Sequence, residues 1–313
     1  MTAPRRAFAA FTALDAWWFG PAPAERLAAV RILVGSFALL YLVTRAAHLL
    51  ALPDLPALSY APVGLLQLLG DDTALHPTLF RALVLLALPL AACFTAGVAH
   101  RLLAPLFAAT LAILFTTRSS FGMVFHTDNL LLLHVAVLAL APAADAWRFG
   151  SPASTLASAP APDAQYGWPL RALAALTCLT YLLAGVAKLR IAGFAWLSGD
   201  GLRDQVAVDN LRALLLGASP SPLALPLLAH AAAFQLLAVA TLALELFAPL
   251  ALVSARAALV FTVIAWSFHV GVAALMFIVF PYPLAGVAFA PLFACERPLA
   301  WLVQRARRRP RGA

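Results

Sequence analysis

The stretch Pro169–Leu189 reads PLRALAALTCLTYLLAGVAKL and decides the class of fold. It is apolar over roughly the 20 residues that a helix needs to cross about 30 Å of hydrocarbon. Lys188, next to its end, is a charge in a run that is otherwise nearly free of them. A lysine at hydrocarbon depth is energetically expensive and therefore predicts a functional site. The alternative is a lysine whose head reaches up to the lipid headgroups.

The rest of the chain has the same character. Of its 313 residues, 64% are hydrophobic and 11% are charged, and the mean hydropathy is +0.92. We therefore predict an all-α, polytopic membrane bundle of about eight transmembrane helices within residues 27–295. The predicted spans are Leu27–Thr44, Leu79–Gly97, Leu102–Thr117, Asp128–Pro142, Pro169–Leu189, Leu225–Val253, Ala257–Phe280 and Pro283–Cys295.

Three of these spans are unusual in length or composition. The fourth and the eighth are short for a helix that crosses the whole bilayer, so each is expected either to be incomplete or to lie in a thinned bilayer. The sixth is long and contains Pro226 and Pro249. Because proline interrupts the hydrogen bonds of a helix, this span is expected to be tilted or kinked.

The two ends of the chain are predicted to lie outside the hydrocarbon. Residues 1–26 should form an amphipathic segment at the membrane interface, where Trp17 and Trp18 would lie at headgroup level. A secretory signal is the alternative, but Asp15 and the tryptophan pair speak against it. Residues 296–313 form a basic tail, with five arginines in the stretch Arg305–Arg311.

The distribution of charge predicts the orientation. The net charge is +8, and much of it lies in the tail and in alternate loops. Lysine and arginine accumulate on the cytoplasmic side of membrane proteins and attract anionic lipid. We therefore expect a protein of the inner membrane with both termini in the cytoplasm and with membrane lipids, not nucleic acid, as partners.

Neither a disulfide framework nor a metal site is expected. Cys93, Cys178 and Cys295 lie in apolar segments without paired spacing. His126 and His134 are eight residues apart, which at 3.6 residues per turn puts them on different parts of the helix surface.

Two polar residues fall at corresponding ends of neighbouring spans. His126 begins the fourth span and Lys188 ends the fifth. Because consecutive spans are antiparallel, both should emerge at the outer face, where a histidine and a lysine can act as an acid and base pair. In the alternative interpretation, His126, Asp128 and Asn129 only cap a helix.

The other charges within apolar runs are Arg31 and Glu245, which lie at similar predicted depths. Unpaired charges at such depths are rare, so we predict a structural ion pair between them, with a proton path as the alternative. His269 lies in the middle of the seventh span. It is either a core histidine or a residue that lines a cavity.

Several stretches resemble motifs of one family, the vitamin K-dependent gamma-carboxylases and their bacterial relatives, the HTTM (horizontally transferred transmembrane) proteins. Leu27–Leu40 (LAAVRILVGSFALL) is similar to the pattern of the first span. Tyr181–Leu189 (YLLAGVAKL) resembles Tyr-x-x-Ala-Gly-x-x-Lys-Leu. The remaining similarities are a Trp-x-x-Gly at Trp196 and Gly199, the Phe268–His269 pair and the stretch Phe280–Phe293.

The resemblance implies a quinol-dependent site that opens outward. Lys188 would be the base that deprotonates a reduced quinone similar to vitamin K hydroquinone, and His126 would assist it. Tyr181, Trp196 and His269 would lie at this cofactor, without a metal.

This chain also departs from the family pattern. Ala187 stands where the family often has a lysine, and the chain ends soon after its last predicted span. We therefore expect no counterpart of the large extramembrane domain with which the animal carboxylases hold their protein substrates, and this speaks against a protein substrate. The alternative function is a non-catalytic scaffold that binds lipid or quinone. A transporter is less favoured, because we see no inverted repeat.

Overall fold

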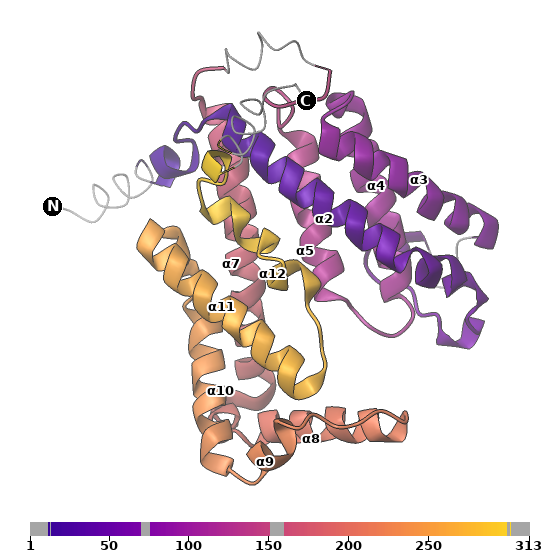
Figure 1. Cartoon of the computed structure of the whole chain (residues 1–313), viewed down its shortest axis with the longest axis vertical. Helices are drawn as coiled ribbons and strands as arrows, with labels where there is room; N and C mark the ends of the chain where they lie inside the picture. Colours follow the sequence, from indigo (N-terminus) through magenta and orange to yellow (C-terminus); the bar gives the residue numbers. More distant parts are fainter. Residues whose placement is uncertain (1–11, 13, 70–75, 151–159, 299–300, 302–313) are drawn as a thin grey trace, which may run out of the picture. The chain divides into compact units, whose positions relative to one another are not determined.

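The computed structural model describes residues 12, 14–69, 76–150, 160–298 and 301, and it is all-α in these residues (Figure 1). The chain divides into two compact units. One comprises residues 1–173 and 294–313, and the other comprises residues 174–293. Helix α7 (Ala164–Ala192) runs through the boundary between them.

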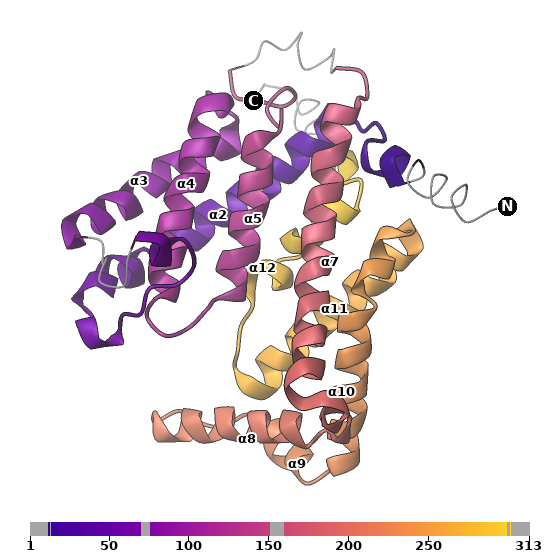
Figure 2. The same cartoon turned by 180° about the vertical axis from the view of Figure 1, so that it is seen from behind.

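The first unit is built on four helices: α2 (Ala24–Ala51), α3 (Pro77–Ala96), α4 (His100–Ser119) and α5 (His126–Leu140). Helix α2 packs against α3 and α5, and α4 packs against α3 and α5 (Figure 2). Between α2 and α3 lie the 3₁₀ segments η1 (Leu52–Asp54), η2 (Ala57–Ser59) and η3 (Gly64–Leu69).

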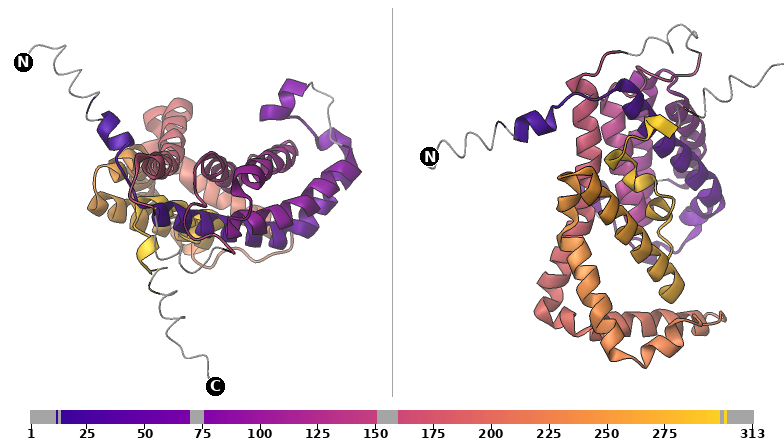
Figure 3. Two further views of the ribbon diagram at one scale, coloured as in Figure 1. Left: turned by 90° about the horizontal axis from the view of Figure 1, so that it is seen from above. Right: turned by 60° about the vertical axis from the view of Figure 1, so that its left-hand side comes forward.

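The second unit contains the rest of α7, followed by η4 (Gly193–Ser198), α8 (Asp200–Leu215), α9 (Ala224–Leu228), α10 (Ala231–Leu246), η5 (Ala248–Leu252) and α11 (Ala255–Met276). It ends with α12 (Pro281–Leu284) and η6 (Val287–Leu292). Within this unit, α8 lies across the ends of α7 and α10 rather than alongside them (Figure 3).

The ends of the helices follow the local sequence. Pro77 stands in the first turn of α3, where its missing N–H costs nothing. Gly97 ends the same helix with a φ of 72°, a left-handed conformation that glycine adopts without strain. The side chain of Ser254 accepts a hydrogen bond from the backbone N–H of Ala257 at 3.2 Å and so caps the start of α11.

The prediction of a polytopic membrane bundle is confirmed. In the described residues, 5 helical segments are long and apolar enough to cross a membrane, and α5 and α10 are shorter apolar helices. The sixth predicted span is divided into α9, α10 and η5. The break before η5 falls at Pro249, in the first turn of that segment, whereas the break between α9 and α10 lies at Ala229 and His230, after Pro226.

The eighth predicted span is not a continuous helix. The chain forms the four-residue helix α12, turns at Gly286 with a φ of 74°, and continues as the 3₁₀ segment η6. Pro291 contributes to the break, because it lacks a backbone N–H that a continuous helix would use, whereas Pro281 and Pro283 lie in the first turn of α12, where a missing N–H costs nothing.

The terminal segments are described only in part. Residues 14–18 are helical, as predicted for the N-terminal segment, and the rings of Trp17 and Trp18 lie 5.7 Å apart. The placement of this helix at a membrane surface stays a prediction. The five arginines of the C-terminal tail fall outside the described residues.

Candidate functional site

One face of α7 carries the motif residues Tyr181, Gly185 and Lys188. Their spacing of four and three residues puts them on the same side of a helix. Tyr181 and Gly185 are buried and Lys188 is half-buried, so this face is directed toward the interior of the second unit.

Lys188 is paired with Glu245 of α10. Its Nζ donates to Oε1 at 2.5 Å and to Oε2 at 2.7 Å, and the two side chains are 22% and 4% exposed. The ammonium is therefore held by a carboxylate inside this unit. Because both of these hydrogen bonds go to Glu245, Lys188 is not the free lysine of the alternative interpretation, whose head would reach the lipid headgroups.

Gly185 allows the two helices to approach at this point. A Cβ added there would lie 3.0 Å from both the Cβ of Glu245 and the Cδ2 of Leu246. A larger residue would push α10 away and lengthen the Lys188–Glu245 contact. The Ala-Gly of the motif thus has a physical purpose, which is to place a carboxylate within reach of the lysine.

This pair corrects the predicted partner of Glu245, which was Arg31. Sequence depth alone suggested Arg31, because both residues were counted from the same side of the membrane. In the structure, both carboxylate oxygens of Glu245 accept hydrogen bonds from Lys188. Sequence reasoning missed this pair, although the lone charges in two apolar runs were the signal that could have found it.

Arg31 has a different environment within the first unit. It is completely buried, and its Nη2 donates to the backbone oxygen of Trp147 at 2.6 Å. A Cβ at Gly97 would overlap its Nη1, so the guanidinium fills the space beside the C-terminal end of α3. The partial negative charge of a helix C-terminus stabilises a cation there.

Trp196 lies beside the ion pair. The Nζ of Lys188 is 5.3 Å from the centre of the indole ring, within the range of a cation–π interaction. In the described part of the chain, the buried Nε1 of Trp196 has no hydrogen-bond partner. A buried donor without a partner is costly and is rare in folded proteins.

Gly199 completes the Trp-x-x-Gly motif. Its φ is 84°, and a Cβ there would overlap the backbone nitrogen of Gln235. Glycine is required on both counts. It lets the turn that carries Trp196 pack directly on the backbone of α10, the helix that also carries Glu245.

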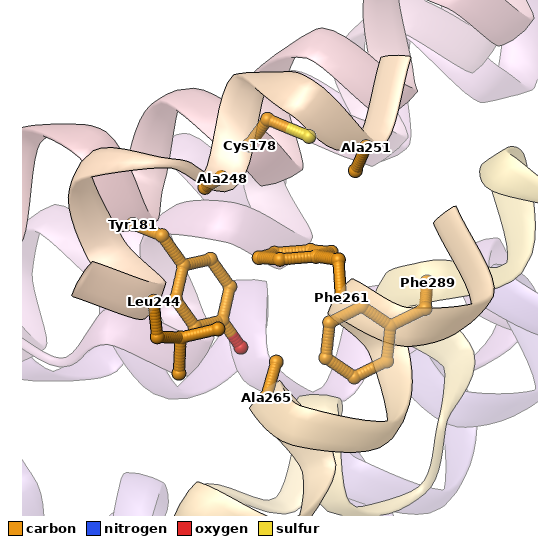
Figure 4. Close-up of a cluster of buried hydrophobic side chains, with 8 residues drawn as sticks. All are labelled: Cys178, Tyr181, Leu244, Ala248, Ala251, Phe261, Ala265 and Phe289. Atoms are coloured by element: carbon orange, nitrogen blue, oxygen red, sulfur yellow. The ribbon is translucent and has the colours of Figure 1, made fainter. Parts of the chain in front are cut away.

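Tyr181 and His269 form a second polar contact in this unit. The Oη of Tyr181 lies 2.7 Å from Nε2 of His269, and both residues are buried. Figure 4 shows Tyr181 inside a cluster of apolar side chains with its hydroxyl at one edge. The other members of this cluster are Cys178, Leu244, Ala248, Ala251, Phe261, Ala265 and Phe289. His269 is therefore a core histidine with a defined partner.

His126 is the first residue of α5, and its flanking residues are fixed by Arg118 of α4. The guanidinium carbon of Arg118 lies 3.6 Å from the centre of the Phe125 ring, and Nη1 donates to Asp128 at 2.7 Å. Tyr41 bridges the two charges, since its Oη donates to Asp128 at 2.7 Å and accepts from Arg118 at 2.9 Å.

The structure separates the two interpretations of this helix start. Phe125 is the N-cap and makes no side-chain cap, while Asp128 is completely buried in the Arg118 network. Asp128 is therefore a charge partner and not a cap. His126 belongs to the first unit and Lys188 to the second, so their shared cavity stays a prediction.

No group of three or more potential metal ligands occurs among the described residues. The family model for the HTTM domain matches residues 19–297, which is most of the chain. Neither the curated proteins nor the solved structures contain a match.

Proposed function

Because the chain belongs to the HTTM domain family, we propose that it binds a reduced quinone within the membrane and accepts a proton from it at the Lys188–Glu245 pair. The family is linked to vitamin K-dependent, carboxylase-like membrane proteins. The observation that carries the proposal is the juxtaposition of the Lys188–Glu245 pair, half-buried at the lysine and buried at the glutamate, with an indole N–H that has no partner among the described residues.

The residues suit a quinol in three respects. The N–H of Trp196 can donate to a phenolic oxygen, and its ring offers an aromatic face. The ammonium of Lys188 can pair with the anion that forms when the quinol loses a proton. When bound, a quinol supplies an acidic phenolic hydrogen, together with electrons that dioxygen can take.

The ion pair can accept the proton without changing its partners. Lys188 and Glu245 share one proton, as ammonium and carboxylate or as amine and carboxylic acid. One further proton converts either form to an ammonium beside a carboxylic acid, and the net charge of the pair rises from zero to +1. This positive charge then balances the negative charge of the deprotonated quinol in a medium where Coulomb interactions are strong. Lys188 acts as the base through the amine form, in which its own proton has moved to Glu245. Starting from the ammonium and the carboxylate, the net result of the proton transfer is a carboxylic acid at Glu245.

The experiment uses the purified protein in lipid nanodiscs with a reduced naphthoquinone. Oxygen-dependent loss of the quinol is measured, and its product is identified by mass spectrometry. Lys188→Met should abolish turnover, and Lys188→Arg should fail as well, because arginine stays charged and cannot act as a base. Arg190→Met is the matched control, since it removes an exposed cation two residues further along α7.

The possible results discriminate between two functions. Turnover that is lost in both Lys188 variants but kept in Arg190→Met supports the proposal. Equal turnover in the wild type and Lys188→Met removes Lys188 from the mechanism. Binding of the quinol without turnover in the wild type favours the non-catalytic scaffold, for which the Lys188–Glu245 pair would be purely structural.

A further inference from the structure

The second unit contains an apolar pocket that is lined by one motif residue, Phe268, and not by Lys188, Tyr181, Trp196 or His269. It lies between α8, α10 and α11 and has a volume of about 300 Å³. Ligand pockets in proteins begin at about this size. Its lining consists of Leu202, Val206, Phe234, Leu237, Ala240, Thr241, Leu244, Ile264, Ser267, Phe268, Gly271, Val272, Leu275 and Met276.

The pocket is elongated along the helices. Its lining extends along α10 from Phe234 to Leu244, or about 15 Å at 1.5 Å per residue. Along α11 it extends from Ile264 to Met276, or about 18 Å at 1.5 Å per residue. No lining side chain is charged, and the hydroxyls of Thr241 and Ser267 are its polar groups. This shape and chemistry fit one extended hydrocarbon chain.

Gly271 keeps this pocket open. It lies in the interior of α11, where glycine costs about 1 kcal/mol relative to alanine. A Cβ at this position would meet no atom within 4 Å, and the backbone is ordinary helix. Neither close packing nor backbone conformation therefore requires glycine here. The position adds open volume to the pocket instead.

A cation lies beside the α8 end of the pocket. The Nε of Arg203 donates to the backbone oxygen of Leu228 at 2.8 Å, and Leu228 packs against a buried cluster whose members Val206 and Phe234 line the pocket. In the described part of the chain, no ion pair includes Arg203. An arginine fork next to an apolar slot matches a ligand with a phosphate at one end and a hydrocarbon chain at the other.

We propose that this pocket is a binding site for a bilayer phospholipid. One acyl chain fills the slot between α10 and α11, and the phosphate contacts Arg203 on α8. The site is separate from the Lys188–Glu245 pair and does not depend on the function proposed for that pair. Since α8 otherwise lies across the ends of its neighbours, a bound lipid would fasten it to α10 and α11.

The test uses the protein in detergent micelles with added phosphatidylglycerol that carries a diazirine near the end of one acyl chain. After photolysis, labelled peptides are identified by mass spectrometry. We expect labels on the pocket faces of α10 and α11. Gly271→Leu fills part of the open volume and should therefore reduce this labelling about tenfold. Such a reduction corresponds to about 1.4 kcal/mol of binding free energy. Val270→Leu, at a neighbouring position that is 38% exposed, is the control and should label normally.

Competition identifies the ligand. Unlabelled phosphatidylglycerol should displace the probe better than diacylglycerol, which lacks the phosphate, and Arg203→Gln should remove this preference. If only a tailed quinone displaces the probe, the slot holds a quinone tail and the proposal is wrong. Equal labelling of wild type and Gly271→Leu also overturns it, and the elution of each variant as a monodisperse species shows that it is folded. Gly271→Ala, a smaller addition, should give intermediate labelling.

Discussion

The ammonium of Lys188 lies 2.5 and 2.7 Å from the two carboxylate oxygens of Glu245, across the narrow contact of α7 and α10. Removing one partner of a buried ion pair leaves an uncompensated charge and costs about 3–5 kcal/mol, whereas replacing both can be nearly neutral. Glu245→Gln alone should therefore lower the thermal stability of the purified protein more than the double variant with Lys188→Met.

The same cycle with Arg31→Met is the control for this prediction. Arg31 donates to the backbone oxygen of Trp147, so its effect should simply add to that of Glu245→Gln. If instead the Lys188 and Glu245 effects add and those of Arg31 and Glu245 do not, the assignment of the pair is wrong.

Two glycines in the second unit should respond in opposite ways to the same substitution. Gly185→Ala places a Cβ 3.0 Å from Glu245 and Leu246, and overpacking of this kind costs about 1–3 kcal/mol. Gly271→Ala meets open space and gains about 1 kcal/mol of helix propensity. Thermal unfolding of both variants in the same detergent tests the contrast, and equal shifts would contradict the close contact at Gly185.

In the buried network of Tyr41, Arg118 and Asp128, loss of the ion pair should cost more stability than loss of the tyrosine hydrogen bond. Asp128→Asn leaves the guanidinium of Arg118 without its carboxylate and should cost about 3–5 kcal/mol. Tyr41→Phe removes one hydrogen bond to that carboxylate and should cost about 1–3 kcal/mol. Thermal stability measures both variants, and a larger loss for Tyr41→Phe would mean that the ion pair contributes little.

Topology is tested independently of any activity. The positive-inside rule predicts cytoplasmic termini in the inner membrane. A reporter that is active only in the cytoplasm, fused after Ala313, should be active, and a periplasmic reporter at the same position should be silent. The reverse result would invert the orientation and place the Lys188 site on the other side of the membrane.

The sequence was sufficient for the helices that are continuously apolar. Spans such as α2 and α11 follow from hydropathy, because a long apolar run without breakers has few other solutions in a membrane. The eighth span, Pro283–Cys295, was expected to be incomplete or to lie in a thinned bilayer because it is short, and the structure has an interrupted segment there. The helix ends before Gly286, whose φ of 74° is a left-handed conformation that a continuous helix cannot contain.

The sequence named candidate residues but not their contacts. The motifs pointed to Lys188, Trp196 and Tyr181, yet they could not show that Glu245 is the partner of the lysine. Counting residues gives a depth in the membrane, but not the rotation of each helix about its axis, and that rotation decides which charges meet. Asp128 was misinterpreted for the same reason, because its partner Arg118 lies on a neighbouring helix.

The central claim is that the Lys188–Glu245 pair accepts a proton from a bound quinol. Infrared difference spectroscopy tests it most directly, by comparing the protein with a reduced naphthoquinone against the protein with the oxidised form. The account predicts a carboxylic acid C=O band on binding of the quinol, which shifts in heavy water and is absent in Glu245→Gln but present in Arg190→Met. If that band does not appear, or if it persists in Glu245→Gln, the pair does not take up the proton.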